Sequence, residues 1–218
     1  MSARKKELTR MFVWRSFKEA GAIIENSHFV YVSGRHGSVY IDHHAIYTVL
    51  KAVSQMCRFM AEDIYDLSLG CEIEVVLGPE GGGIILSRFL KEHLDRFGGK
   101  RISLWAKKQY GDNGLRKFVL PRAFIKHISG KKVFLIDDIL TSGSTFYELT
   151  ELANRYGANV VGLGCLWNRG GVTSGDLGGI PLFSLFEKRF EDFDKSECPF
   201  CESGIPINNE FGHGRNLR

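Results

Sequence analysis

The sequence predicts an α/β protein built on a central parallel sheet with helices on both of its faces. Short apolar segments typical of buried strands alternate with longer amphipathic segments typical of helices along the 218 residues. Such an alternation favours parallel strands joined by helical crossovers. Three of the expected strands also run into glycine-rich or acidic loops, and in this fold class ligands bind at the carboxyl ends of the strands.

The elements follow from local patterns. Leu8, Met11 and Phe17 fall on overlapping faces of an amphipathic helix from Arg4 to Ala20. Two short strands are expected around the turn from Ser33 to Ser38. The expected strands and helices, in chain order, are Phe29–Val32 and Val39–Ile41 (strands), Ala45–Leu67 (one long helix), Glu74–Leu77 (strand), Ile84–Phe97 (helix), Arg101–Trp105 and Val133–Ile136 (strands), Phe146–Tyr156 (helix), and Val160–Leu166 and Leu182–Phe186 (strands).

Length and composition are those of one globular domain over residues 1–218. The chain is 44% hydrophobic, and no apolar run reaches the ~20 residues of a membrane span. A net charge of +4, spread along the chain, favours small anionic substrates over nucleic acid. The charged N-terminus precedes no apolar signal segment, and five cysteines are an odd number. We therefore expect a cytoplasmic protein with reduced thiols and no membrane or nucleic-acid partner.

The most informative segment runs from Val133 to Thr145. Four apolar residues lead into Asp137 and Asp138, a loop of small residues follows, and a helix-like run begins soon after. The N–H groups of such a turn, at the positive end of a helix dipole, bind phosphate. The carboxylates cannot usefully face a phosphate, so they are expected to hold hydroxyl groups or a metal-bound sugar beside it. The segment predicts a site for a sugar phosphate.

This segment resembles the phosphoribosyl pyrophosphate (PRPP) signature of the type I phosphoribosyltransferases, an apolar strand, Asp-Asp, two residues, and Thr-x-Gly-x-Thr. The resemblance implies the type I fold, a parallel sheet flanked by helices with a small hood. It also implies that the acids hold the ribose hydroxyls and that the loop cradles the 5′-phosphate. The PRPP-binding residues implied here are Asp137, Asp138, Ile139, Leu140, Thr141, Ser142, Gly143, Ser144 and Thr145.

Two further loops match the family in order. The segment Gly78–Gly83 has four glycines in six residues, and the resemblance makes it the pyrophosphate loop, with Glu80, Gly81, Gly82 and Gly83 on the ligand. The polar segment Lys107–Lys117 is expected to be a mobile loop that closes over the departing pyrophosphate. The catalytic residues implied are Lys107, Lys108 and Asp138, with Mg²⁺ as cofactor and no metal-binding side chains beyond Asp137 and Asp138.

Within the family the sequence is most similar to the orotate branch. The segment from His28 to Arg35, followed by Val39–Asp42, resembles the part of that branch that covers the base. Arg169 falls where orotate enzymes grip the substrate carboxylate, which an Arg fork can bond through both oxygens. The implied base-binding residues are Arg169, Tyr40, Ile41 and Thr141. The resemblance also implies a homodimer, and a hood formed by residues 12–45 and part of the tail 187–218.

Four positions depart from the orotate pattern. Val32 and Gly82 stand where that branch usually has Lys, while Gly111 and Asn113 replace a Lys and a His of the catalytic loop. Arg116 and Lys117, nearby in the sequence, could compensate. The pair Glu80-Gly81 is also similar to purine-type enzymes. Transfer to a purine or another base, and a PRPP-binding regulator without turnover, therefore remain alternatives to an orotate phosphoribosyltransferase.

The tail contains a second chemical motif. Cys198 and Cys201 form a Cys-x-x-Cys pair, and His213 follows. Zinc needs four ligands, so this sequence offers a zinc site only if a dimer partner or Cys165 completes it. The alternative is a pair of reduced cysteines that pack in the tail.

Overall fold

The computed structural model describes residues 3–67, 69–70, 72–111 and 116–212, and it divides the chain into two compact units. Unit 1 comprises residues 1–14 and 50–188, and unit 2 comprises residues 15–49 and 189–218. The first helix, α1 (Ala3–Glu19), contributes residues to both units. Within the described residues, no helix combines the length and apolar character needed to cross a bilayer.

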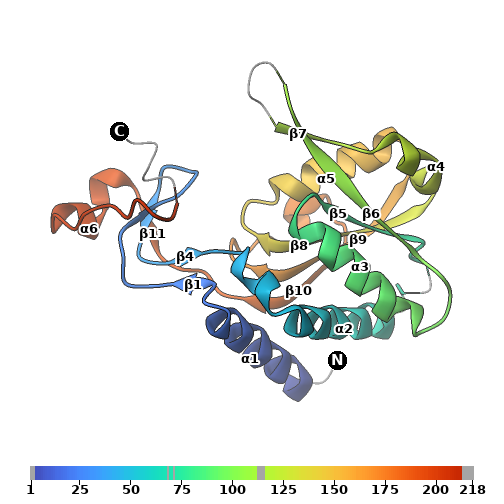
Figure 1. Cartoon of the computed structure of the whole chain (residues 1–218), viewed down its shortest axis with the longest axis horizontal. Helices are drawn as coiled ribbons and strands as arrows, with labels where there is room; N and C mark the ends of the chain where they lie inside the picture. The colour runs from blue at the N-terminus through green and yellow to red at the C-terminus, as the bar shows by residue number, and fades with distance from the viewer. Residues whose placement is uncertain (1–2, 68, 71, 112–115, 213–218) are drawn as a thin grey trace. The chain divides into compact units, whose positions relative to one another are not determined.

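A six-stranded sheet in the order β10-β9-β8-β5-β6-β7 forms the centre of unit 1 (Figure 1). Its neighbours pair in parallel, except that β7 runs antiparallel to β6 at one edge. Chain order reverses between β5 and β8, so the crevice typical of ligand binding in open α/β sheets is expected there. The strands are β5 (Val75–Pro79), β6 (Ile102–Tyr110), β7 (Arg116–Val119), β8 (Lys132–Leu140), β9 (Asn159–Asn168) and β10 (Leu182–Glu187).

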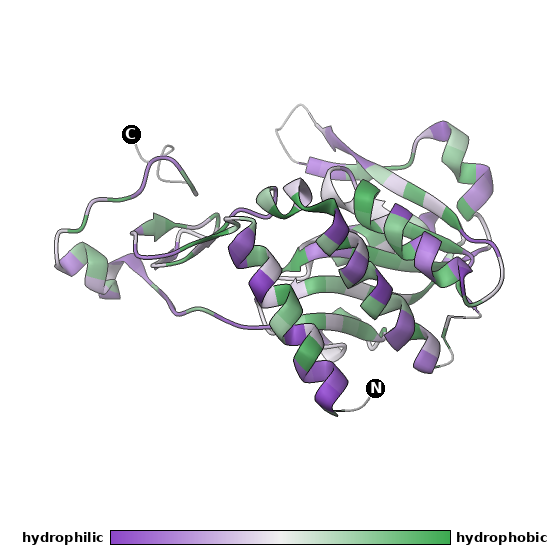
Figure 2. Ribbon diagram, turned by 60° about the horizontal axis from the view of Figure 1, so that its bottom comes forward, coloured by the Kyte–Doolittle hydropathy of each residue, from purple (hydrophilic) through white to green (hydrophobic). Residues whose placement is uncertain are grey.

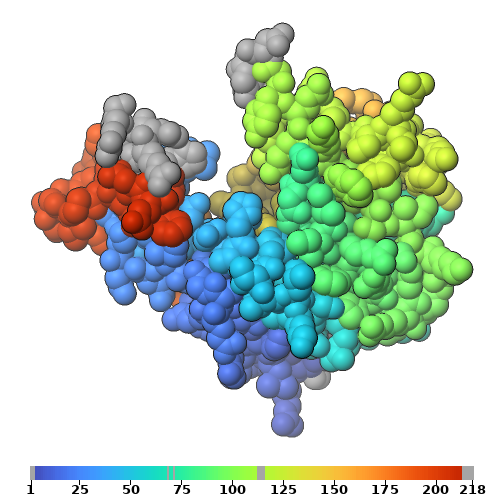
Figure 3. Space-filling view, in the orientation of Figure 1, coloured from blue at the N-terminus to red at the C-terminus, as the bar shows by residue number. Residues whose placement is uncertain are grey.

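Helices cover both faces of this sheet, as predicted. The face of Val75, Leu77 and Leu135 packs with Phe146 and Leu149 of α5 (Ser144–Arg155) in one core. The helices α2 (Leu50–Asp66) and α3 (Gly82–Asp95) pack on each other, and both are visible on the face of the molecule seen in Figure 3. Figure 2 shows hydrophobic residues concentrated in the sheet and on the inward sides of the helices. A short helix, α4 (Ile125–Ile128), follows a 3₁₀ turn at Arg122–Phe124.

Unit 2 contains two small sheets. In one, β1 (Ile23–Ile24) pairs antiparallel with β4 (Tyr40–Ile41). In the other, β3 (His36–Gly37) lies between β2 (Phe29–Val30) and β11 (Asp192–Phe193), so it joins the early and late segments of the chain. A short helix, α6 (Pro199–Glu202), follows a 3₁₀ turn at Lys195–Glu197. These segments overlap those expected to form the hood, and that role stays a prediction.

Three local expectations were wrong. The long helix predicted from residue 45 is interrupted, because Ala45–Thr48 is a 3₁₀ turn and Val49 leaves the helical region before α2 begins. The expected turn around residues 33–38 contains β3. The polar segment after Lys107 is not a loop as a whole, since its two ends pair as β6 and β7. Polar side chains suit such a hairpin, where one face meets water.

Candidate active site

The acid pair lies within β8 and not after it. This strand continues to Leu140, so Asp137 and Asp138 belong to its last residues. Beyond the pair Leu77 and Leu135, β8 is no longer paired with β5, although it stays paired with β9 as far as Leu140 and Asn168. The two central strands therefore separate at their carboxyl ends, and the acids occur on β8 just past that point.

Successive strand residues point to opposite faces, so the two carboxylates have different surroundings. Asp138 is buried, with 7% of its surface exposed, and Asp137 is partly exposed. The Asp138 N–H donates to Asp137 Oδ1 at 2.9 Å, and the Ile139 N–H donates to Asp138 Oδ1 at 2.7 Å. These bonds fix the orientation of both carboxyl groups, as a hydroxyl-binding site needs.

The Asp137 carboxyl has a perturbed pKa. Burial raises this pKa well above its ordinary value, and the neighbouring Asp138 raises it further. The bond from the Asp138 N–H and the positive charges of Lys108 and Arg116 act in the opposite direction. A carboxyl in this environment becomes fully ionised when a cation or hydroxyl donors arrive to stabilise its charge.

The expected phosphate loop joins β8 to α5. Thr141, Ser142 and Ser144 are exposed, and the Ser144 N–H donates to Ser142 Oγ at 3.4 Å. Gly143 is in the left-handed region at φ 83°, and a Cβ there would lie 2.9 Å from Leu177 Cδ2. Glycine is required because both the backbone conformation and the available space exclude a side chain. The turn thus directs the first N–H groups of a twelve-residue helix toward an exposed loop.

The glycine-rich loop joins β5 to α3, across the separation from the acid pair. Gly81 has φ 102° and precedes the helix, and Gly82 is in its first turn. Gly78 and Gly83 have a different role, because a Cβ on Gly78 would lie 2.3 Å from the Gly83 carbonyl oxygen. These two glycines let the strand and the helix approach each other, whereas a Cβ on Gly81 would meet nothing within 4 Å. The expected role of Gly81 and Gly82 in binding a ligand stays a prediction.

Lys107 and Lys108 lie on opposite faces of β6. Lys108 pairs directly with Phe118, and Tyr110 with Arg116, so Lys108 and Arg116 share one face of the hairpin. Both affect the pKa of Asp137, as described above. Lys107 pairs with Val119 and shares the other face with Lys117. Of the two cations that were expected to compensate, Arg116 is therefore the one near the acid pair.

Two glutamates bond to residues on the hairpin face of Lys108 and Arg116, and neither contact was predicted from the sequence. The Lys108 N–H donates to Glu80 Oε2 at 2.8 Å, which ties β6 to the glycine-rich loop. The Arg116 guanidinium donates to Glu148 of α5 at 2.9 Å. No local pattern signals such pairs, because the partners are 28 and 32 residues apart in the chain.

The expected base-binding residues occur in both units. In unit 1, the N–H groups of Arg169 and Gly170 both donate to the Leu140 carbonyl oxygen, which brings Arg169 to the loop that begins at Thr141. In unit 2, Tyr40 packs against the rings of Phe29 and Phe211. Ile41 is buried, with 7% of its surface exposed. Their joint role in binding a base stays a prediction.

The remaining positions singled out in the sequence are the catalytic-loop substitutions and the cysteine motif of the tail. Gly111 follows β6, while Asn113 and His213 lie outside the described residues. Cys198 and Cys201 are in unit 2, close to two histidines that the sequence had not connected with them. Cys165 is on β9 of unit 1 and is not among the residues of that cluster.

Comparison with known proteins agrees with this geometry. A family model described as "Phosphoribosyl transferase domain" matches residues 45–177. A protein of Thermotoga maritima named orotate phosphoribosyltransferase is 32% identical over 199 residues, which are 90% of this chain and 96% of that protein.

Solved structures support the same fold. Orotate phosphoribosyltransferase from Aeropyrum pernix superposes with a TM-score of 0.60 at 23% identity, covering 79% of this chain and 92% of that one. Adenine phosphoribosyltransferase from Rhodothermus marinus gives 0.58 at 20% identity, covering 81% and 98%. The family model matches more than half of this chain, and a relative of 32% identity aligns with nine-tenths of it. This chain therefore belongs to the phosphoribosyltransferase family.

Proposed function

We propose that this enzyme transfers ribose 5-phosphate from PRPP to orotate and releases pyrophosphate. One observation carries the proposal. At the chain-order reversal between β5 and β8, where the two strands separate, an acid pair lies among the last residues of β8. A phosphate-type helix N-terminus follows β8, and a glycine-rich loop follows β5. The similarity to relatives named orotate phosphoribosyltransferase supports the choice of base.

The proposed roles follow from chemistry. Asp137 and Asp138 accept hydrogen bonds from the ribose hydroxyls, and the loop Thr141–Thr145 binds the 5′-phosphate through its N–H groups. Gly81 and Gly82 bind the pyrophosphate. As the bond to pyrophosphate breaks, C1′ gains positive charge and the leaving oxygens gain negative charge. Lys108 stabilises the leaving group electrostatically. Lys107 lies on the opposite face of the strand and has the smaller share in this stabilisation.

Mg²⁺ fits the donor set of this site. It prefers hard oxygen ligands and commonly uses one or two carboxylates together with substrate phosphates. Asp137 is partly exposed and its pKa is raised, so it offers a carboxyl group that a bound cation would keep fully ionised. Bound there, Mg²⁺ would neutralise charge on the pyrophosphate.

Arg169 is proposed to select the base. Its backbone is held beside the start of the phosphate loop by the Leu140 carbonyl oxygen. A guanidinium can bond both oxygens of the orotate carboxylate, which adenine and hypoxanthine lack. A site built to hydrogen-bond a substrate group can reject analogues that lack that group by about 10⁴–10⁵.

We further propose a homodimer in the cytoplasm. Leu8 and Met11 of α1 are more than half exposed, as expected for residues that a second copy covers. Cys57 and Cys165 are buried free thiols, which suits a reducing compartment. Light scattering on the purified protein would give the oligomeric state.

The activity is tested with PRPP and Mg²⁺, offering orotate beside adenine, guanine, hypoxanthine, xanthine and uracil. The expected product is orotidine 5′-phosphate, and Arg169→Ala should reduce its formation far more than it weakens PRPP binding. Arg155→Ala, a cation at the end of α5, serves as the matched control. A purine nucleotide product would transfer the proposal to another base. PRPP binding without any product would identify a regulator.

A further inference from the structure

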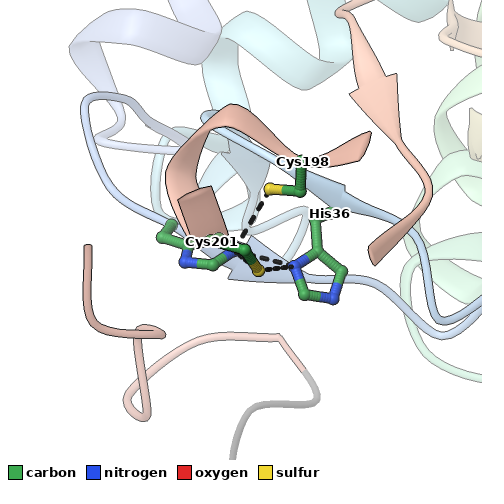
Figure 4. Close-up of side chains that lie close together, drawn as sticks. His36, Cys198 and Cys201 are labelled. Carbon is green, nitrogen blue, oxygen red and sulfur yellow. Dashed lines mark hydrogen bonds between the residues drawn. The ribbon is translucent and has the colours of Figure 1, made fainter. Parts of the chain in front are cut away.

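Four metal-ligating side chains meet in unit 2. They are His28, His36, Cys198 and Cys201, and one ligand atom from each lies within 4.8 Å of all the others. The first three are buried, and Cys201 is partly buried. Figure 4 shows His36 and the two cysteines pointing toward one another from the β2–β3 hairpin and the start of α6.

Three of the separations between ligand atoms match those of a tetrahedral zinc site, and the one between the two imidazole nitrogens is shorter. His36 Nδ1 lies 2.8 Å from His28 Nε2 and 3.4 Å from Cys201 Sγ. His28 Nε2 lies 3.6 Å from Cys198 Sγ and 3.7 Å from Cys201 Sγ. Zn–S bonds of about 2.3 Å and Zn–N bonds of about 2.0 Å, arranged tetrahedrally, place the ligand atoms roughly 3.3–3.8 Å apart. A single ion therefore fits between these four atoms with only a small displacement of the two imidazoles.

His28 is oriented for coordination. Its Nδ1 lies 2.8 Å from the Ile205 carbonyl oxygen, which can only accept, so Nδ1 carries the proton and Nε2 presents a lone pair to the cluster. Zinc-binding histidines commonly donate their other N–H to a carbonyl in this way. The His28 carbonyl oxygen in turn accepts from the Asn208 N–H at 2.7 Å. The tail after α6 thus fixes both the backbone and the ring of this residue.

The surrounding structure holds the two halves together. Val30 pairs with His36 in the hairpin, so His28 and His36 lie diagonally on one face of it. Arg35, next to His36, donates to the carboxylates of Asp192 and Asp194 at 2.6 and 2.8 Å. These bonds anchor the late segment that leads to Cys198. The cysteines flank Pro199 and Phe200, and the Phe200 ring packs against His28 at 5.6 Å between centroids.

We propose that His28, His36, Cys198 and Cys201 bind one Zn²⁺ that stabilises unit 2. Two thiolates and two neutral imidazoles suit zinc, and the two negative charges balance the ion in a buried position. Four protein ligands leave no open position, so the ion is structural. Unit 2 is small, and small domains commonly depend on a metal or disulfide. The zinc proposal does not rest on the proposed transferase activity.

Metal analysis of the untagged protein, purified under reducing conditions, tests the proposal. We expect about one zinc per chain in the wild type. His36→Asn and Cys198→Ser should lose it. His44→Asn and Cys57→Ser should keep it, since His44 is exposed in unit 2 and Cys57 is a buried thiol of unit 1.

A second measurement uses the wild type alone, so it tests the proposal even if the ligand variants fail to fold. Chelated protein titrated with Co²⁺ should show the intense ligand-field bands of a tetrahedral site and thiolate-to-cobalt charge transfer, saturating at one equivalent. A weak octahedral spectrum, zinc retained in both ligand variants, or wild-type protein that is purified without zinc and with a Cys198–Cys201 disulfide would each overturn the proposal.

Discussion

The acid-pair site of unit 1 and the cysteine–histidine cluster of unit 2 are built in opposite ways. In unit 1 each group of candidate site residues lies in the last part of one strand or just after it, and the sheet brings these groups together. In unit 2 the ligands come from two short segments, with Cys201 and His36 separated by 165 residues. The first site lies next to a large hydrophobic core, and the second joins an early and a late segment of the smaller unit. The difference suggests that the sheet is enough to position the catalytic groups, whereas unit 2 needs its ion.

Removal of zinc should give the largest difference between the two units. With a chelator, we expect the segments around His28–Gly37 and Cys198–Asn208 to lose most of their hydrogen-exchange protection. Structural zinc can contribute on the order of 10 kcal/mol to the folding of a small unit. Protection in β5 and β8 should persist. Equal loss of protection in both units would show that they fold as one.

The lysines of β6 offer a sharper test within unit 1. Lys108→Ala should reduce kcat/KM by about 10²–10³, the usual cost of one preorganised electrostatic contact. Lys107→Ala, the matched control on the opposite face of the strand, should cost about tenfold or less. Steady-state kinetics with saturating Mg²⁺ would measure both. Equal losses would mean that both faces of the hairpin meet substrate.

Substitution of Gly78 tests whether this glycine is needed for packing or for ligand binding. Gly78→Ala should lower the free energy of unfolding by about 1–3 kcal/mol, because its Cβ would press on the backbone of Gly83. Gly175→Ala, where a Cβ meets only Thr173 Oγ1 at 3.5 Å, should be nearly neutral. Thermal unfolding gives both values. A variant Gly78→Ala of normal stability but weak PRPP binding would assign this glycine to the ligand.

The raised pKa of Asp137 predicts the smallest effect. The folded state holds this proton more tightly than the unfolded chain, so stability present below the unfolded pKa of about 3.9 is lost as the pH rises through the higher folded pKa. Asp137→Asn removes that loss and should stabilise the ligand-free protein at neutral pH by about 1 kcal/mol.

The affinity for PRPP should rise with pH, whereas the contribution of Asp137 to the stability of the ligand-free protein falls. PRPP with Mg²⁺ needs the ionised carboxylate, so affinity should fall up to tenfold per pH unit below the raised pKa. Calorimetric titration over that pH range measures this. Glu151→Gln, an exposed carboxylate of α5, controls for a change in charge alone. A pH profile unchanged by Asp137→Asn would exclude this group.

The sequence predicted the sheet, its helices and the location of the acid pair because these are encoded by contiguous patterns. Val133–Thr145 contains strand, acids, loop and helix start in one stretch, so the phosphate-type turn could be recognised before its geometry was known. The break at Val49 could not be predicted, since helical periodicity continues through it and only the backbone reveals the change. The strand character of Lys107–Tyr110 was also hidden, because its polar residues are typical of loops.

Contacts between distant residues explain most of what the sequence left open. The partners of Cys198 and Cys201 are histidines on a hairpin near the other end of the chain, and a histidine on an apolar strand is usually a buried structural residue. The β3 pairing with both β2 and β11, together with bonds such as those from Arg35 to two aspartates of the late segment, connects these segments, and none of these contacts is visible in the sequence. The same holds for Arg116, whose relation to Asp137 follows from the register of β6 and β7.

The order in which the metal ligands occur has a consequence during protein synthesis. His28 and His36 leave the ribosome early, but Cys198 follows 170 residues after His28. Domains generally fold as they emerge, so the sheet of unit 1 can begin to form before the two cysteine ligands have been synthesised. Metal loading would then be among the last steps of maturation. A chain truncated before Cys198 would contain all six strands of the sheet but only two of the four proposed metal ligands.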